Sequence, residues 1–178
     1  SEVERVEREL DKVITDLRRL LDDLKRKNEE LVRRIRELLK KVKERNKKIV
    51  TEIDDLLRRR KTEEVLKEIK KLLEDAHRDN TEVLKEVRRI VKEAHDLNKK
   101  VLDEIKKLLR ELLEDLKRLN VDERIIRRIK ELADRIEERV KELNERVREE
   151  VRKLEEDIKK LDDESREEAR KLEDKVRQ

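Results

Sequence analysis

Apolar residues recur at intervals of 18 along this chain, and that interval indicates how the chain folds. Leu17, Ile35 and Ile53 form one such column, and Val65 and Val83 belong to another. An interval of 18 residues spans five turns at about 3.6 residues per turn, the pitch of an undistorted α-helix. A repeat of seven residues would instead impose a left-handed supercoil. The pattern therefore predicts straight helices, each with one continuous apolar face.

Two positions carry signals for helix ends. Thr62 precedes two glutamates, the arrangement of an N-cap residue followed by acids in the first turn. Asn120 can adopt the left-handed conformation that ends many helices, and Asp122 can cap the next helix. The apolar phase is lost at both positions, but it passes unshifted through the segment 79–82, which also resembles a helix start. The predicted helices cover residues 2–60, 62–119 and 122–178.

The width of the apolar face predicts how many neighbours each helix has. At about 100° per residue, the apolar positions cover an arc of about 120° in the first and third helices and about 140° in the second. An arc of this width suits a helix that contacts two others. Short connections make consecutive helices antiparallel. We therefore predict an all-α fold, a long antiparallel untwisted three-helix bundle with coiled-coil-like packing that forms one domain over residues 1–178.

The composition at first suggests disorder, because 58% of the residues are charged and only 33% are hydrophobic. However, 54 basic and 50 acidic residues leave a net charge of only +4, and the apolar third is mostly Leu, Ile and Val. The absence of cysteine excludes a disulfide framework and a thiolate metal site. No apolar stretch is long enough to cross a membrane. We expect a soluble protein with no cofactor and no membrane partner.

The basic run at residues 58–61 is the one candidate for nucleic-acid binding. It lies at a predicted helix C-terminus, where cations complement the helix dipole. Elsewhere the basic residues alternate with acids. We therefore expect no nucleic-acid partner.

Polar residues interrupt the apolar columns and form the candidate site of this chain. In two antiparallel neighbouring helices, the numbers of any two residues at the same height add up to a constant. This sum should be about 122 for helices joined by a turn near residue 61 and about 242 for helices joined by a turn near residue 121. These sums predict two polar layers, about 27 Å apart along the helix axis. One layer holds Asn28, His95, Asn98 and Asn144, and the other holds Asn46, His77, Asn80, Asp162 and Ser165.

Fixing the register of the helices is the role that best explains amides in an aliphatic core. A buried donor or acceptor without a partner costs about 1–3 kcal/mol, whereas a matched one is nearly neutral. A fully aliphatic repeat could slide by 18 residues with little loss, and polar layers present in only some repeats oppose that slip.

Three sharper interpretations of these residues are weaker. Ser165, His77 and Asp162 are the residue types of a nucleophilic triad, but a site in mid-helix offers no free backbone N–H for an oxyanion hole. His77 with Asp162 has metal-ligand types, but the two histidines are too far apart to share an ion. A buried histidine that loses an acceptor nitrogen on protonation could open the layers in acid, which makes a pH switch the better alternative.

Taken together, the 18-residue register, the Lys/Arg/Glu/Asp surface, the Leu/Ile/Val core and the layered Asn and His positions resemble de novo designed helical bundles. The chain is similar in pattern to parametrically generated, untwisted three-helix bundles with buried hydrogen-bond networks. It departs from them in having no glycine for its connections. The resemblance implies a very heat-stable protein with no natural substrate, cofactor, localisation or host.

From the sequence we expect a structural scaffold, not an enzyme, that is monomeric and soluble when expressed in a cytoplasm. Two alternatives remain open. The chain could be a subunit of a designed homo- or hetero-oligomer, because Glu150 and Glu168 replace Leu132 in an edge column of the third helix and make its apolar stripe thinner. It could also be a pH-responsive bundle through its buried histidines.

Overall fold

Over the residues that the structure describes, the fold is all-α and consists of three helices, α1 (Glu2–Arg59), α2 (Glu63–Arg118) and α3 (Glu123–Arg177). The structure is a computed structural model that describes residues 2–59 and 62–177. α2 passes without a break through residues 79–82, as the unshifted apolar columns predict. The predicted helix ends at residues 60 and 178 lie outside the described residues.

The end of α2 follows the predicted capping chemistry. Asn120 has a φ of 51°, which is the left-handed conformation expected of it. The amide of Asn120 donates to the carbonyl of Lys117, and the amide of Val121 donates to that of Leu116, both at 3.2 Å. These two bonds form a Schellman motif, which satisfies the last carbonyls of the helix.

The beginnings of α2 and α3 are capped by side chains. The Thr62 hydroxyl accepts from the amide of Val65 at 3.4 Å, and the Asp122 carboxylate accepts from the amide of Arg124 at 3.2 Å. Each cap satisfies a backbone donor that has no partner within its helix. These caps form in a chain that has neither Gly nor Pro.

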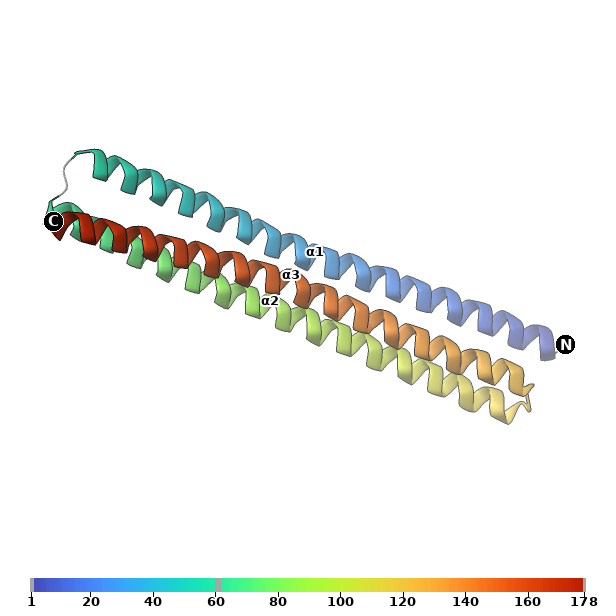
Figure 1. Cartoon of the computed structure of the whole chain (residues 1–178). Helices are drawn as coiled ribbons and strands as arrows, with labels where there is room; N and C mark the ends of the chain where they lie inside the picture. The colour runs from blue at the N-terminus through green and yellow to red at the C-terminus, as the bar shows by residue number, and fades with distance from the viewer. Residues whose placement is uncertain (1, 60–61, 178) are drawn as a thin grey trace. The chain divides into compact units, whose positions relative to one another are not determined.

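Figure 1 shows the three helices, coloured by residue number. Packing divides the chain into two compact units, and each contains segments of all three helices. The first unit comprises Ser1–Leu31 and Val91–Arg148, and the second comprises Val32–Ile90 and Glu149–Gln178. The expectation of a single domain over residues 1–178 stays a prediction.

The first unit is a three-helix bundle with an aliphatic core. Its buried cluster takes residues from all three helices, namely Val6, Leu17, Ile105, Leu109, Leu112, Leu116, Ile129 and Ile136. Val121 packs against this cluster and so ties the connection between α2 and α3 to the core. α2 and α3 are antiparallel here, because Asn98 contacts Asn144 whereas Lys106, further along α2, contacts Glu137.

The second unit has the same organisation. Ile53 and Ile69 form a buried cluster between α1 and α2 near their connection. α1 and α3 are parallel in this unit, because Arg36 pairs with Glu150 and Lys43, further along α1, pairs with Asp157. Each unit therefore buries one face of every helix against the two others, as the apolar arcs predict.

Candidate functional site

Three asparagines from three helices meet in the core of the first unit. Asn28 of α1 donates from Nδ2 to Oδ1 of Asn98 at 2.7 Å, and Asn98 of α2 returns a hydrogen bond to Oδ1 of Asn28 at 3.0 Å. Asn98 also donates from Nδ2 to Oδ1 of Asn144 on α3 at 2.6 Å. We call this group the amide network.

The amide network satisfies the donors of its two buried members. An asparagine amide nitrogen has two protons to donate. Asn98 gives one to each neighbouring helix, and Asn28 gives its second to the carbonyl of Leu24 at 2.8 Å. Asn98 is 0% exposed and Asn28 is 3% exposed, whereas Asn144 is half-buried. The network is therefore a polar cross-link between the three helices, and its hydrogen bonds require its members to lie at one height.

His95 lies in the same unit and was predicted to belong to the same layer, but no hydrogen bond joins its Nε2 atom to the amide network. Its Nε2 atom is buried and has no hydrogen-bond partner among the described residues. Burial lowers the pKa of His95 below its ordinary value, the positive charge of Arg148 lowers the pKa further, and the negative charge of Asp96 opposes both effects. These surroundings favour the neutral imidazole.

The predicted second layer is not joined as expected. Asn46 and Asn80 are both buried, but no hydrogen bond joins them in the described part of the chain, and Nδ2 of Asn46 has no partner at all. A common height brings two amides near one another, but a bond also requires rotamers that aim the donor at the acceptor.

The expectation that His77 is buried is wrong, because 51% of its side-chain surface is exposed. It nevertheless contacts the predicted partner: Nδ1 lies 2.6 Å from Oδ2 of Asp162. Arg166, one turn further along α3, has its Nη2 3.9 Å from the same carboxylate oxygen. Ser165 is half-buried and donates to the carbonyl of Leu161 at 2.8 Å, so its proton is directed to its own helix rather than to His77.

The pairing of Arg36 with Glu150 in the second unit was not predicted. Arg36 of α1 donates to both carboxylate oxygens of Glu150 on α3, at 2.7 and 3.4 Å. This bidentate bond and the charge of Glu150 raise the pKa of Arg36. The sequence signal was Glu150 itself, because it interrupts an apolar edge column. The glutamate that makes the stripe of α3 thinner is thus paired within the chain.

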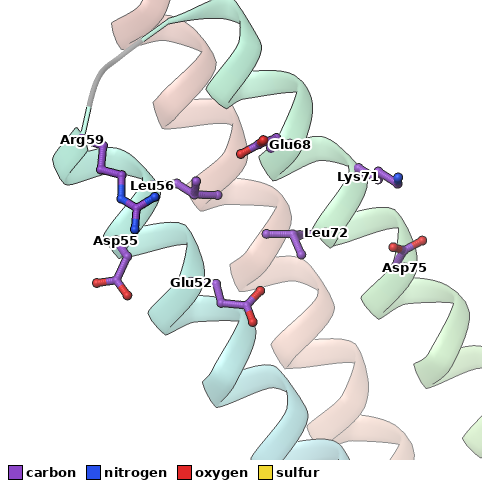
Figure 2. Close-up of a pocket in the computed structure, with 8 residues that line it drawn as sticks. All are labelled: Glu52, Asp55, Leu56, Arg59, Glu68, Lys71, Leu72 and Asp75. Carbon is purple, nitrogen blue, oxygen red and sulfur yellow. The ribbon is translucent and has the colours of Figure 1, made fainter.

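Two surface furrows lie in the second unit. The first, of about 460 Å³, runs between α1 and α2. Figure 2 shows Leu56 and Leu72 facing the space between these helices, with charged residues around them. Its complete lining is Glu52, Asp55, Leu56, Arg59, Glu68, Lys71, Leu72 and Asp75, and none of these residues is buried. Its rim carries both acidic and basic residues, so its charge favours neither an anionic nor a cationic ligand.

The second furrow, of about 600 Å³, runs between α1 and α3 and includes Asn46 and Ser165 in its lining. Val50, one of three large apolar residues that are exposed within the described ranges, also lines it. Lys43 and Lys47 stand on the α1 side, opposite glutamates of α3.

The described residues contain no cluster of three or more His, Asp or Glu side chains that could hold a metal ion. Among the helices of residues 2–59 and 62–177, none has a stretch that is both long and apolar enough to cross a membrane.

Comparison with known proteins gives a structural likeness to solved structures and no sequence relative. No family model matches the chain, and no curated protein matches it. A solved structure described as a computationally designed three helix bundle is similar over 97% of this chain and 82% of its own, with 17% sequence identity and a TM-score of 0.41. A score this low does not by itself establish a common fold, so the assignment as a three-helix bundle rests on the helix packing described above.

Proposed function

We propose that this chain is a designed structural scaffold in which the amide network fixes the relative heights of the three helices. The observation that carries the proposal is the position of Asn98. Its amide is completely buried and donates to both neighbouring helices at once. An amide in that position can be satisfied only while all three helices keep their heights.

The arrangement of the columns supports this role. Along α1 the column reads Leu10, Asn28 and Asn46, and along α2 it reads Asn80, Asn98 and Leu116. Sliding one helix by 18 residues in either direction places a leucine opposite an asparagine. Each asparagine stranded in this way costs about 1–3 kcal/mol, whereas a leucine opposite a leucine costs nothing.

The composition supports a designed origin. The sequence has no Gly, Pro, Cys, Met or aromatic residue among 178 positions, and strong helix formers fill its surface. We propose that the scaffold has no natural substrate and was not made as an enzyme, since a site in mid-helix offers no free backbone N–H groups for an oxyanion hole. We expect a thermal midpoint above about 90 °C, which is the range of hyperstable proteins.

Spin labels test the register directly. One label replaces Arg19 of α1 and the other replaces Lys107 of α2, both exposed positions in the first unit. With the amide network intact, pulsed dipolar spectroscopy should give a single narrow distance distribution. With Leu at positions 28, 98 and 144 together, a second population or a clear broadening should appear. An unchanged single distribution in the triple variant would refute the register role.

We also propose that the chain is monomeric. Glu150, one of the two glutamates that interrupt an apolar edge column of α3, pairs with Arg36 within the chain. The large apolar residues exposed in the described ranges are Val50, Leu108 and Leu119. Single exposed apolar residues are normal on monomers. Sedimentation equilibrium at micromolar concentration should give the mass of one chain, and a multiple of that mass would favour the oligomer instead.

A further inference from the structure

The contact between His77 and Asp162 plays no part in the amide network, and it has the geometry of an activated imidazole. Nδ1 of His77 lies 2.6 Å from Oδ2 of Asp162. An ionised carboxylate only accepts hydrogen bonds, so the proton of a neutral ring resides on Nδ1. The lone pair is then on Nε2, and half of the side-chain surface is open to solvent.

We propose that His77 is a nucleophilic catalyst of acyl transfer from activated esters to water, with Asp162 as its positioning residue. A carboxylate that holds Nδ1–H fixes the tautomer with a free Nε2 and stabilises the imidazolium that forms during the reaction. This activity goes beyond the role of a scaffold. It requires an accessible nucleophile and a good leaving group, and it requires no enclosed pocket.

The reaction balances without a cofactor. In a phenyl ester, the Nε2 lone pair of His77 attacks the carbonyl carbon. The bond between this carbon and the phenol oxygen then breaks, and its electron pair leaves with the phenolate. The acyl-imidazolium releases its Nδ1 proton towards Asp162 and from there to water. A water molecule then attacks the acyl carbon, which yields the carboxylic acid and regenerates the neutral imidazole.

Four other kinds of nucleophile are less suited to turnover than His77. There is no cysteine. The hydroxyl of Ser165, one turn along α3 from Asp162, donates to the Leu161 carbonyl and so does not direct its proton to a general base. Lysine amines form stable amides, so each reacts once and does not turn over. His95 has a buried Nε2, which an ester cannot reach.

The two histidines therefore provide a matched comparison within one chain. The full-length protein is incubated with p-nitrophenyl acetate in excess at about pH 7.5, where a histidine can act as a neutral base. The multiple-turnover rate above buffer is measured after the initial burst from lysine acylation. His77→Gln should reduce this rate at least about tenfold. His95→Gln should retain it within about twofold.

A second series isolates Asp162. Asp162→Asn should lower the turnover rate about threefold to tenfold, and Asp162→Glu should restore part of it. Nitrogen-15 NMR of the His77 ring distinguishes positioning from a merely structural effect, because Asp162→Asn should move the proton from Nδ1 towards Nε2 while circular dichroism stays unchanged. Hydroxylamine should intercept the acyl-imidazole in the wild type and in His95→Gln.

The role of His77 and the role of Asp162 can each be refuted by a different result. Full turnover in His77→Gln, or an equal loss in His95→Gln, would overturn the assignment of the nucleophile. An unchanged rate and an unchanged tautomer in Asp162→Asn would overturn the role of the carboxylate. None of these results would affect the register proposal, because the amide network contains neither residue.

Discussion

Asn28 and Asn98 exchange two side-chain hydrogen bonds across α1 and α2, with Nδ2–Oδ1 distances of 2.7 and 3.0 Å. A reciprocal amide pair of this kind forms only when both residues lie at the same height and both side chains are aimed at each other. Asn144 and the Leu24 carbonyl take the remaining protons of the pair. The pair is therefore sensitive to helix register in a way that aliphatic contacts are not.

Replacing Asn98, which bonds to both other members of the amide network, should destabilise the protein. Asn98→Leu leaves the Asn28 side chain with only its bond to the Leu24 carbonyl and removes the amide that donates to Asn144, so the free energy of unfolding should fall by about 1–3 kcal/mol. Guanidinium titration measures it. The triple change Asn28→Leu, Asn98→Leu and Asn144→Leu should be neutral or stabilising, because no polar group is then stranded. A single variant more stable than the triple variant would refute the network.

Replacing Asn46 with leucine should stabilise the protein, in contrast to Asn98→Leu. Its side chain is 7% exposed, and its Nδ2 has no hydrogen-bond partner among the described residues. Asn46→Leu removes an unsatisfied buried donor and puts apolar atoms in its place, so the free energy of unfolding should rise by about 1–3 kcal/mol. The comparison with Asn98→Leu is internally controlled, since both replace a buried Asn with Leu. A destabilised Asn46→Leu would mean that the amide is bonded in solution.

The helices and their ends could be predicted from the sequence because their causes are local. The 18-residue columns report the pitch of a single helix, and the caps at Thr62 and Asp122 act on backbone amides two or three residues away. Asn120 similarly determines its own conformation. None of these features depends on how a distant side chain is oriented.

The polar contacts were less predictable, because they depend on rotamers and on neighbouring helices. Column positions brought Asn28 and Asn98 together correctly, but the same reasoning paired Asn46 with Asn80, which form no hydrogen bond. His77 lies in an edge column, where a small rotation of the helix decides between burial and exposure.

The turn between α2 and α3 offers a test of backbone strain. Asn120 occupies the left-handed region at φ 51°, where a Cβ atom costs roughly 1–2 kcal/mol for most residues. Asn120→Gly should raise the free energy of unfolding by up to about 1 kcal/mol, and the β-branched Asn120→Val should lower it by about 1–2 kcal/mol. Thermal unfolding followed by circular dichroism can rank the three proteins. A valine variant as stable as the glycine variant would show that the turn adopts another conformation in solution.

The surroundings of His95 predict how stability changes with pH. Burial and Arg148 lower its pKa in the folded state below the ordinary value of 6.5, so the folded state binds fewer protons than the unfolded state in that range. The contribution of neutral His95 to the free energy of unfolding is therefore fully present above about pH 6.5. It is lost progressively as the pH falls from there towards the lowered pKa, and it changes no further at a pH below that pKa.

We therefore expect guanidinium midpoints of the wild type to decrease between about pH 7.5 and pH 5, above the range in which most carboxylates titrate. His95→Gln should flatten this slope, because glutamine does not ionise. Arg148→Gln should reduce the slope in part, since it removes one of the two causes of the lowered pKa. An NMR titration of His95 with a midpoint at or above 6.5 would contradict the assignment, and so would a slope in His95→Gln as steep as that of the wild type.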